Sequence, residues 1–112
     1  PGWRVFEQDV VSYLSRRALF ATVEDNPMYS ETGSGKRHKP DAVVKSGSKF
    51  LEVHEVKDVA VLKPGHVEQA AGYDDVFEPS RGTTLHVRKR TYVSDAVWNL
   101  LELYDIALKR WA

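Results

Sequence analysis

The stretch PDAVVKSGSKFLEVHEVK, residues 40–57, decides the fold prediction for this chain. Two runs rich in apolar side chains lie on either side of Ser46-Gly47-Ser48, which is a typical turn sequence. We therefore expect strands over residues 41–44 and 50–58, joined as a β-hairpin. The other predicted elements are arranged around this hairpin.

Three charged side chains of the hairpin are expected to converge. Glu55 and Lys57 are two residues apart, so they point to the same face of their strand. Asp41 follows Pro40 at the start of the neighbouring strand, which brings its carboxylate beside Glu55. Two converging carboxylates repel each other unless a divalent cation lies between them. Oxygen ligands with water suit Mg²⁺ or Mn²⁺, and the carbonyl oxygen of Val56 is a further candidate ligand.

This arrangement predicts phosphodiester chemistry. A bound metal lowers the pKa of a water and neutralises charge on the phosphate, and Lys57 adds positive charge at the same place. There are plainer readings: Glu55 and Lys57 as a surface pair on an edge strand, and Asp41 as a turn residue after Pro40.

The apolar pattern of residues 3–20 predicts an amphipathic helix. Glu7 falls inside its apolar stripe, and a buried carboxylate is costly unless charge or metal compensates it, so Glu7 is a candidate metal residue. If the stripe is rotated by one position, because Val5 and Phe6 are also apolar, Glu7 becomes a surface acid. The expected stripe consists of Trp3, Val10, Val11, Leu14 and Ala18.

The remaining patterns predict a strand before the hairpin and a helix, a strand and a helix after it. Residues 26–39 read as an exposed loop. The fold class is α+β, with a mixed sheet flanked by helices in three layers, an αβββαβ core and an additional C-terminal helix. The further elements span residues 19–23, 64–77, 83–92 and 94–111.

Several polar residues outside the hairpin are candidates for substrate contact. Gln69 and Tyr73 are four residues apart on one helix face and can bind phosphate oxygens or a base edge, although a Tyr there is often a core residue. His66, one turn earlier, is a weaker candidate. The basic residues Lys36, Arg37 and Lys39 precede Asp41 and are placed to hold flanking phosphates.

Composition excludes several classes of protein. The chain has 112 residues, 42% of them hydrophobic, which is enough for one domain with one core. Lys plus Arg and Asp plus Glu are 16 each, so no bulk field attracts a polyanion, although short basic and acidic runs occur. There is no cysteine and no His-x-x-His spacing, which argues against Zn²⁺. No run is long enough for a membrane anchor.

The order helix glutamate, Pro-Asp, Glu-x-Lys and Gln-xxx-Tyr resembles the PD-(D/E)XK nuclease superfamily, in particular its exonuclease-like branch with the Gln-xxx-Tyr motif. The resemblance covers residues 7–92 and implies a restriction-endonuclease-like fold. It implies that Asp41 and Glu55 bind metal, that Lys57 is catalytic and that Glu7 supports the metal. Gln69 and Tyr73 would then contact substrate. The motif does not distinguish an endonuclease from an exonuclease.

The small size and the first residue, which is Pro, are similar to the C-terminal toxin domains of bacterial polymorphic toxins, such as contact-dependent inhibition and type VI effectors. This resemblance implies delivery as part of a larger secreted protein and action in the target-cell cytoplasm. It also implies a cognate immunity protein, for which the acidic residues 74–78 are a docking candidate. DNA is the expected substrate; the alternatives are an RNase, for instance one that cleaves transfer RNA, and a non-catalytic binding module of the same fold.

Overall fold

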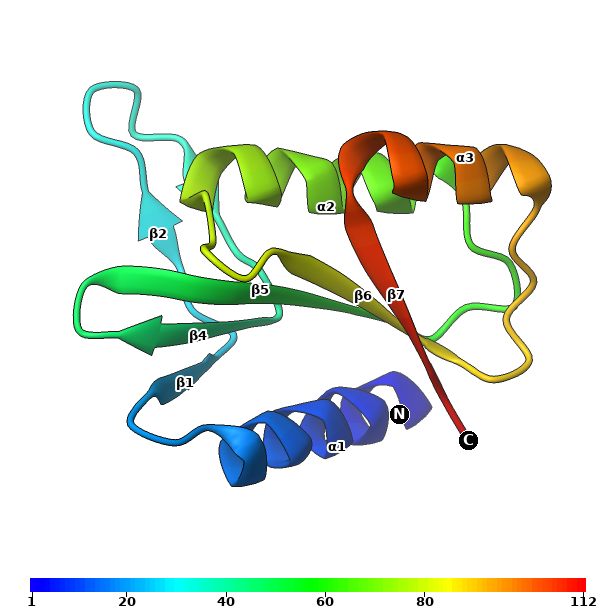
Figure 1. Cartoon of the computed structure of the whole chain (residues 1–112), viewed down its shortest axis with the longest axis horizontal. Coiled ribbons are helices and arrows are strands. Elements are labelled where there is room, and N and C mark those ends of the chain that lie inside the picture. The colour runs from blue at the N-terminus through cyan, green and yellow to red at the C-terminus, as the bar shows by residue number, and fades with distance from the viewer.

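A mixed five-stranded sheet forms the centre of the molecule, and helices cover both of its faces (Figure 1). The computed structural model describes residues 1–112. Helix α1 (Gly2–Arg17) packs on one face, and α2 (Pro64–Phe77) and α3 (Asp95–Tyr104) pack on the other. The α+β class with a mixed sheet between helices is thus confirmed. The strands are β1 (Thr22–Asp25), β4 (Ala42–Ser46), β5 (Lys49–Lys57), β6 (Thr83–Arg88) and β7 (Ile106–Trp111).

The strand order β1-β4-β5-β6-β7 combines two kinds of pairing. Strands β1, β4 and β5 pair antiparallel, as short connections allow. Strands β5, β6 and β7 pair parallel through the crossover helices α2 and α3. In this register Lys57 lies beside Val87, which lies beside Arg110. The carboxyl ends of these three parallel strands therefore lie side by side, and we call this the carboxyl end of the sheet.

Apolar side chains from the two sheet faces form separate cores. On the α1 side, Phe6, Val10, Leu14 and Ala42 are fully buried, and Trp111 packs against them. On the other side, α2 and α3 cover a larger cluster. That cluster contains Leu62, Val67, Ala70, Leu85, Val87, Val93, Val97, Leu101 and Ile106.

The hairpin and the helix after it were predicted correctly. Val43 pairs with Val53 across the hairpin, and Gly47 has a φ of +61°, which a glycine adopts without strain. The helix over residues 64–77 begins with Pro64 at its first turn and ends where Glu78 takes a left-handed conformation before Pro79.

The predicted C-terminal helix is wrong beyond Tyr104. Asp105 takes a left-handed conformation (φ 56°), and the chain then pairs with β6 as strand β7. Leu108 and Trp111 are three residues apart and would share a helix face, but in β7 they pack into the cores on opposite sides of the sheet. Pairing with β6 satisfies the backbone groups along its outer edge, and helix periodicity does not report that gain.

Three other predicted boundaries differ from the structure. The strand over 19–23 is displaced to Thr22–Asp25, and Leu19 and Phe20 are exposed. The predicted loop over 26–39 contains a small antiparallel pair, β2 (Tyr29–Ser30) and β3 (Arg37–His38). Strand β6 ends at Arg88 rather than Tyr92.

None of the three helices combines the length and the apolar composition that crossing a bilayer requires.

Candidate active site

Asp41 and Glu55 are held side by side by the hairpin backbone. The Asp41 N–H donates a hydrogen bond to Glu55 Oε1 (2.8 Å), and the Val56 N–H donates to Asp41 Oδ2 (2.7 Å). The register pairs Ala42 with His54, so Asp41, one residue before β4, lies opposite Glu55. The convergence expected from the hairpin is present.

Lys57 and the α2 pair complete one side of this cluster. Lys57 Nζ lies 3.6 Å from Glu55 Oε2 and donates a hydrogen bond to Gln69 Oε1 (2.7 Å). Tyr73 donates from its hydroxyl to the Lys39 carbonyl oxygen (3.2 Å) and also packs against the apolar cluster around Phe77. Glu55 is only 2% exposed on a central strand, so reading it as part of a surface pair on an edge strand is wrong.

The acids of the cluster hold their protons unusually tightly. Burial, and then the neighbouring Asp41 charge, raises the pKa of Glu55 to about 8. Burial also raises the pKa of Asp41, although the hydrogen bond from the Val56 N–H and the charge of Lys57 oppose that rise. One lysine does not offset the charges of both acids, the buried Glu55 and the half-buried Asp41, so the ionised pair favours a bound cation.

Glu7 joins the cluster from α1, although the helix is rotated relative to the predicted stripe. Phe6, Val10 and Leu14 are the buried residues of α1, and Trp3 is 49% exposed. Glu7 lies half-buried beside that face. Its pKa is raised by burial, then by Asp41 and also by Asp25. The alternative stripe therefore describes the helix better, yet Glu7 still lies close to Asp41.

Asp25 was not anticipated from the sequence. It ends β1 opposite Ala42, and its charge raises the pKa of both Glu7 and Asp41. One sequence signal could have identified Asp25: it is an acid at the end of the strand that pairs with the strand following Asp41. A hollow of about 260 Å³ opens beside these acids. It is lined by Trp3, Arg4, Glu7, Gln8, Asp25 and Asn26.

The donor set fits a hydrated hard cation better than a metal enclosed by protein ligands. No three His, Asp or Glu side chains lie close enough together to surround a metal ion. Asp41 and Glu55 each use one carboxylate oxygen to accept a backbone N–H, which fixes their orientation. Mg²⁺ characteristically binds one or two carboxylates and keeps several waters. Two fixed acids with raised pKa values suit that mode of binding.

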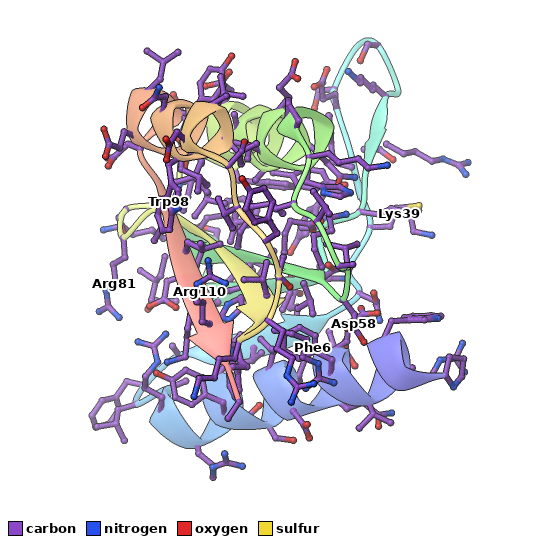
Figure 2. All side chains as sticks on the ribbon, turned by 90° about the vertical axis from the view of Figure 1, so that its right-hand side faces the viewer. Phe6, Lys39, Asp58, Arg81, Trp98 and Arg110 are labelled. Atoms are coloured by element: carbon purple, nitrogen blue, oxygen red, sulfur yellow. The ribbon has the colours of Figure 1, made fainter.

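The other predicted contact residues lie around this centre. Lys36, Arg37 and Lys39 are exposed on the segment that leads into Asp41, and Figure 2 shows Lys39 at the side of the molecule. His66 Nδ1 accepts a hydrogen bond from the Lys63 N–H (3.0 Å) at the start of α2. Burial lowers the pKa of His66, and so do the charges of Lys57 and Lys63.

A second polar cluster occupies the opposite face of β5. Trp111 Nε1–H donates to His86 Nδ1 (2.9 Å), so neutral His86 carries its proton on Nε2 and donates to His54 Nδ1 (2.8 Å). His54 Nε2–H then donates to Glu52 Oε1 (2.8 Å), which also accepts from Arg17 Nη2 (2.6 Å). His54 thus faces away from Glu55, and both of its ring nitrogens are hydrogen-bonded.

The largest hollow, about 620 Å³, is lined by no member of either cluster, although Arg81 on its wall lies 3.8 Å from Glu52. It opens where β6 and β7 begin, and its walls include Asp74, Arg81 and Trp98. Figure 2 shows Arg81 and Trp98 on the side of the view opposite Lys39. It contains none of the candidate catalytic residues.

No family model matches the chain, and no curated protein matches it.

Proposed function

We propose that this chain is a metal-dependent nuclease of the PD-(D/E)XK type that hydrolyses DNA. The observation that carries the proposal is the pair formed by the half-buried Asp41 and the buried Glu55. Their pKa values are raised, and backbone N–H groups fix both carboxylates next to Lys57. Burying two like charges together is unfavourable without a cation. Glu52, the other buried acid of this strand, is in contrast a single carboxylate paired directly with Arg17.

Asp41 and Glu55 would hold Mg²⁺ or Mn²⁺, with the Val56 carbonyl as a further ligand and Glu7 supporting from α1. The metal, when bound, supplies charge neutralisation and an activated water. Lys57 places its ammonium at the cluster, where it stabilises negative charge that develops on the phosphate. Its hydrogen bond to Gln69 fixes that ammonium in place.

The element order supports the same class of fold. When the small β2–β3 pair is set aside, the chain runs helix, three strands, helix, strand, and this is the αβββαβ order that the resemblance implies. The acids come from the second and third of these three strands and the Gln-xxx-Tyr pair from the following helix. We propose a restriction-endonuclease-like topology on this basis, with α3 and β7 added after it.

The biological setting is part of the proposal. A small nuclease domain of this kind fits a toxin delivered as part of a larger protein into a target cell, with an immunity protein as its partner. The acidic residues 74–78 border the largest hollow through Asp74 and remain the candidate docking surface.

Plasmid DNA, both native and heat-denatured, and total RNA, each incubated with Mg²⁺, Mn²⁺, Zn²⁺ or EDTA, test the proposal. We expect DNA cleavage with Mg²⁺ or Mn²⁺ and none with EDTA. Lys57→Ala and Asp41→Asn should each lower the rate at least about 100-fold, as expected for loss of electrostatic stabilisation or of a metal ligand. Lys49→Ala, on the same strand but exposed at its other end, is the matched control and should cleave like wild type.

Other outcomes favour the rival functions. Cleavage of RNA alone would identify an RNase on the same site. Equal cleavage by wild type and Lys57→Ala would contradict the assignment of Lys57. If neither nucleic acid is cut and no divalent cation raises the melting temperature, the non-catalytic binding module is the correct reading.

A further inference from the structure

Two loops at the carboxyl end of the sheet are joined to each other by hydrogen bonds. They are residues 58–63, after β5, and residues 89–94, after β6. The Tyr92 N–H donates to the Ala60 carbonyl (2.9 Å), and the Leu62 N–H donates to the Tyr92 carbonyl (2.9 Å). Thr91 Oγ1 also donates to the Val59 carbonyl (2.8 Å). Figure 2 looks at the molecule from this side, where Asp58 begins the first loop.

The side chain of Arg110, on β7, also holds the second loop in place. Arg110 Nη1 donates to the Thr91 carbonyl (2.7 Å) and to the Lys89 carbonyl (3.3 Å). The backbone of Tyr92 is thus fixed on both sides, yet its side chain is 62% exposed. An aromatic ring on a rigid backbone that contributes little to a core is suited to stacking against a flat ligand.

The charges around Tyr92 suit a phosphate-bearing ligand. Lys89 and Arg90 precede Tyr92 in the same loop, Lys63 ends the other loop, and all three side chains are exposed. None of the three makes an ion pair, whereas Arg88, the last residue of β6, pairs with Asp58 (3.6 Å). Cations left free beside an aromatic ring are typical of surfaces that bind nucleic-acid strands.

A hollow lies against the first of these loops and the first turn of α2. Its volume is about 340 Å³, and it is lined by Val59, Ala60, Val61, Lys63 and His66. Because His66 Nδ1 accepts the Lys63 N–H, the neutral imidazole keeps its proton on Nε2 as a donor. Ala60 is three residues after Lys57, a distance of at most about 10 Å along the chain. A strand whose phosphate lies at Lys57 therefore reaches this hollow with its next nucleotide.

We propose that Tyr92, His66, Lys63, Lys89 and Arg90 form a subsite for an unpaired nucleotide adjacent to the scissile phosphate. The base stacks on Tyr92, and the flanking phosphates lie against the three cations. The bases of an intact duplex are already stacked on each other, so the subsite selects single strands or frayed ends. This inference rests on the proposed nuclease function and names its substrate as single-stranded nucleic acid.

Binding measured without cleavage tests the subsite. Fluorescence anisotropy of labelled single-stranded DNA, single-stranded RNA and a blunt DNA duplex is recorded with wild type in EDTA. We expect tighter binding of a single strand than of the duplex, and a loss of about tenfold with Tyr92→Ala. Tyr92→Phe should retain the affinity, and Tyr104→Ala, an equally large change at an exposed tyrosine of α3, should have no effect. The DNA and RNA arms show which sugar is preferred.

Two results would overturn the subsite: Tyr92→Ala binding single strands like wild type, or losing affinity for the duplex as much as for the single strands. The nuclease proposal fails separately. Metal-dependent cleavage with unchanged binding by Tyr92→Ala rejects only the subsite. Tyr92-dependent binding with no cleavage in any metal rejects the nuclease and leaves a single-strand binding surface.

Discussion

Glu52 and Glu55 lie three residues apart on β5, buried on opposite faces of the sheet. They are 7% and 2% exposed, so water is nearly absent from both. Even so, the pKa of Glu52 is lowered to about 2, by the hydrogen bond from His54 and then by Arg17, whereas burial and Asp41 raise the pKa of Glu55 to about 8. The difference comes from their neighbours.

The two clusters therefore differ in how their acids are compensated. On the α1 face, a chain of hydrogen bonds runs from Arg17 through Glu52, His54 and His86 to Trp111, and both ring nitrogens of each histidine have a partner inside the protein. On the α2 face, two acids share one lysine, which can neutralise only one of them, so Glu55 keeps its proton up to about pH 8 when no cation is bound. A satisfied network stabilises the fold, and an incompletely neutralised one favours a ligand. Breaking either cluster should show which description is correct.

The largest effect on stability is expected from Glu52→Ala. The change leaves Arg17 and His54 without their shared acceptor and should lower the free energy of unfolding by about 3 kcal/mol. Urea denaturation at neutral pH measures it. Glu68→Ala, at an exposed position of α2, is the control and should stay within about 0.5 kcal/mol of wild type. A similarly small change for Glu52→Ala would mean that the network is not structural.

Without divalent metal, stability should fall as pH rises. The folded chain keeps a proton on Glu55 up to about pH 8, whereas the unfolded chain releases it near its ordinary pKa, so folding loses this contribution as the pH rises through that interval. The expected loss is about 3 kcal/mol between about pH 5.5 and 8, at roughly 1.4 kcal/mol per pKa unit. Denaturant titrations in EDTA measure it. Glu55→Gln cannot titrate and should flatten the slope; an unchanged slope would contradict the role given to Glu55.

Mg²⁺ should reverse much of that loss. A cation that binds only the folded chain stabilises it by about 2.7 kcal/mol at 100 times its dissociation constant. The gain should be larger at alkaline pH, because binding requires deprotonated acids. Thermal melts with and without Mg²⁺ measure it. The gain should disappear in Asp41→Asn but persist in Trp111→Phe; equal gains in both would place the cation elsewhere.

The smallest effect is expected from Trp111→Phe. It removes the N–H that reaches His86 Nδ1 but keeps an aromatic ring against Phe6 and Tyr13. Leaving one buried acceptor without a partner should cost about 1–2 kcal/mol. Urea denaturation compared with Trp98→Phe, at an exposed tryptophan of α3, isolates the lost hydrogen bond. Stability equal to that of the control would mean that His86 takes its other tautomer.

The placement of the candidate site could be predicted because its signals are local. A turn at Gly47 and period-two alternation are enough to bring Asp41, Glu55 and Lys57 together, and two prolines bound the helix that carries Gln69. The His86–Trp111 contact joins segments far apart in sequence. The sequence does not predict this contact, because the spacing of Leu108 and Trp111 fits a helix as well as a strand. Only the sheet edge offered by β6 decides between the two, and no local pattern encodes it.

Trp111 also has a consequence for how the chain folds. Its ring meets Phe6 and Tyr13 at centroid distances of 6.2 Å and 5.3 Å, so the last strand completes the packing of the first helix. During synthesis, α1 is made long before β7, and it lacks Trp111 as an aromatic neighbour until about 90 further residues have been added. Closing so long a loop is slow and favours late, concerted formation of the native state.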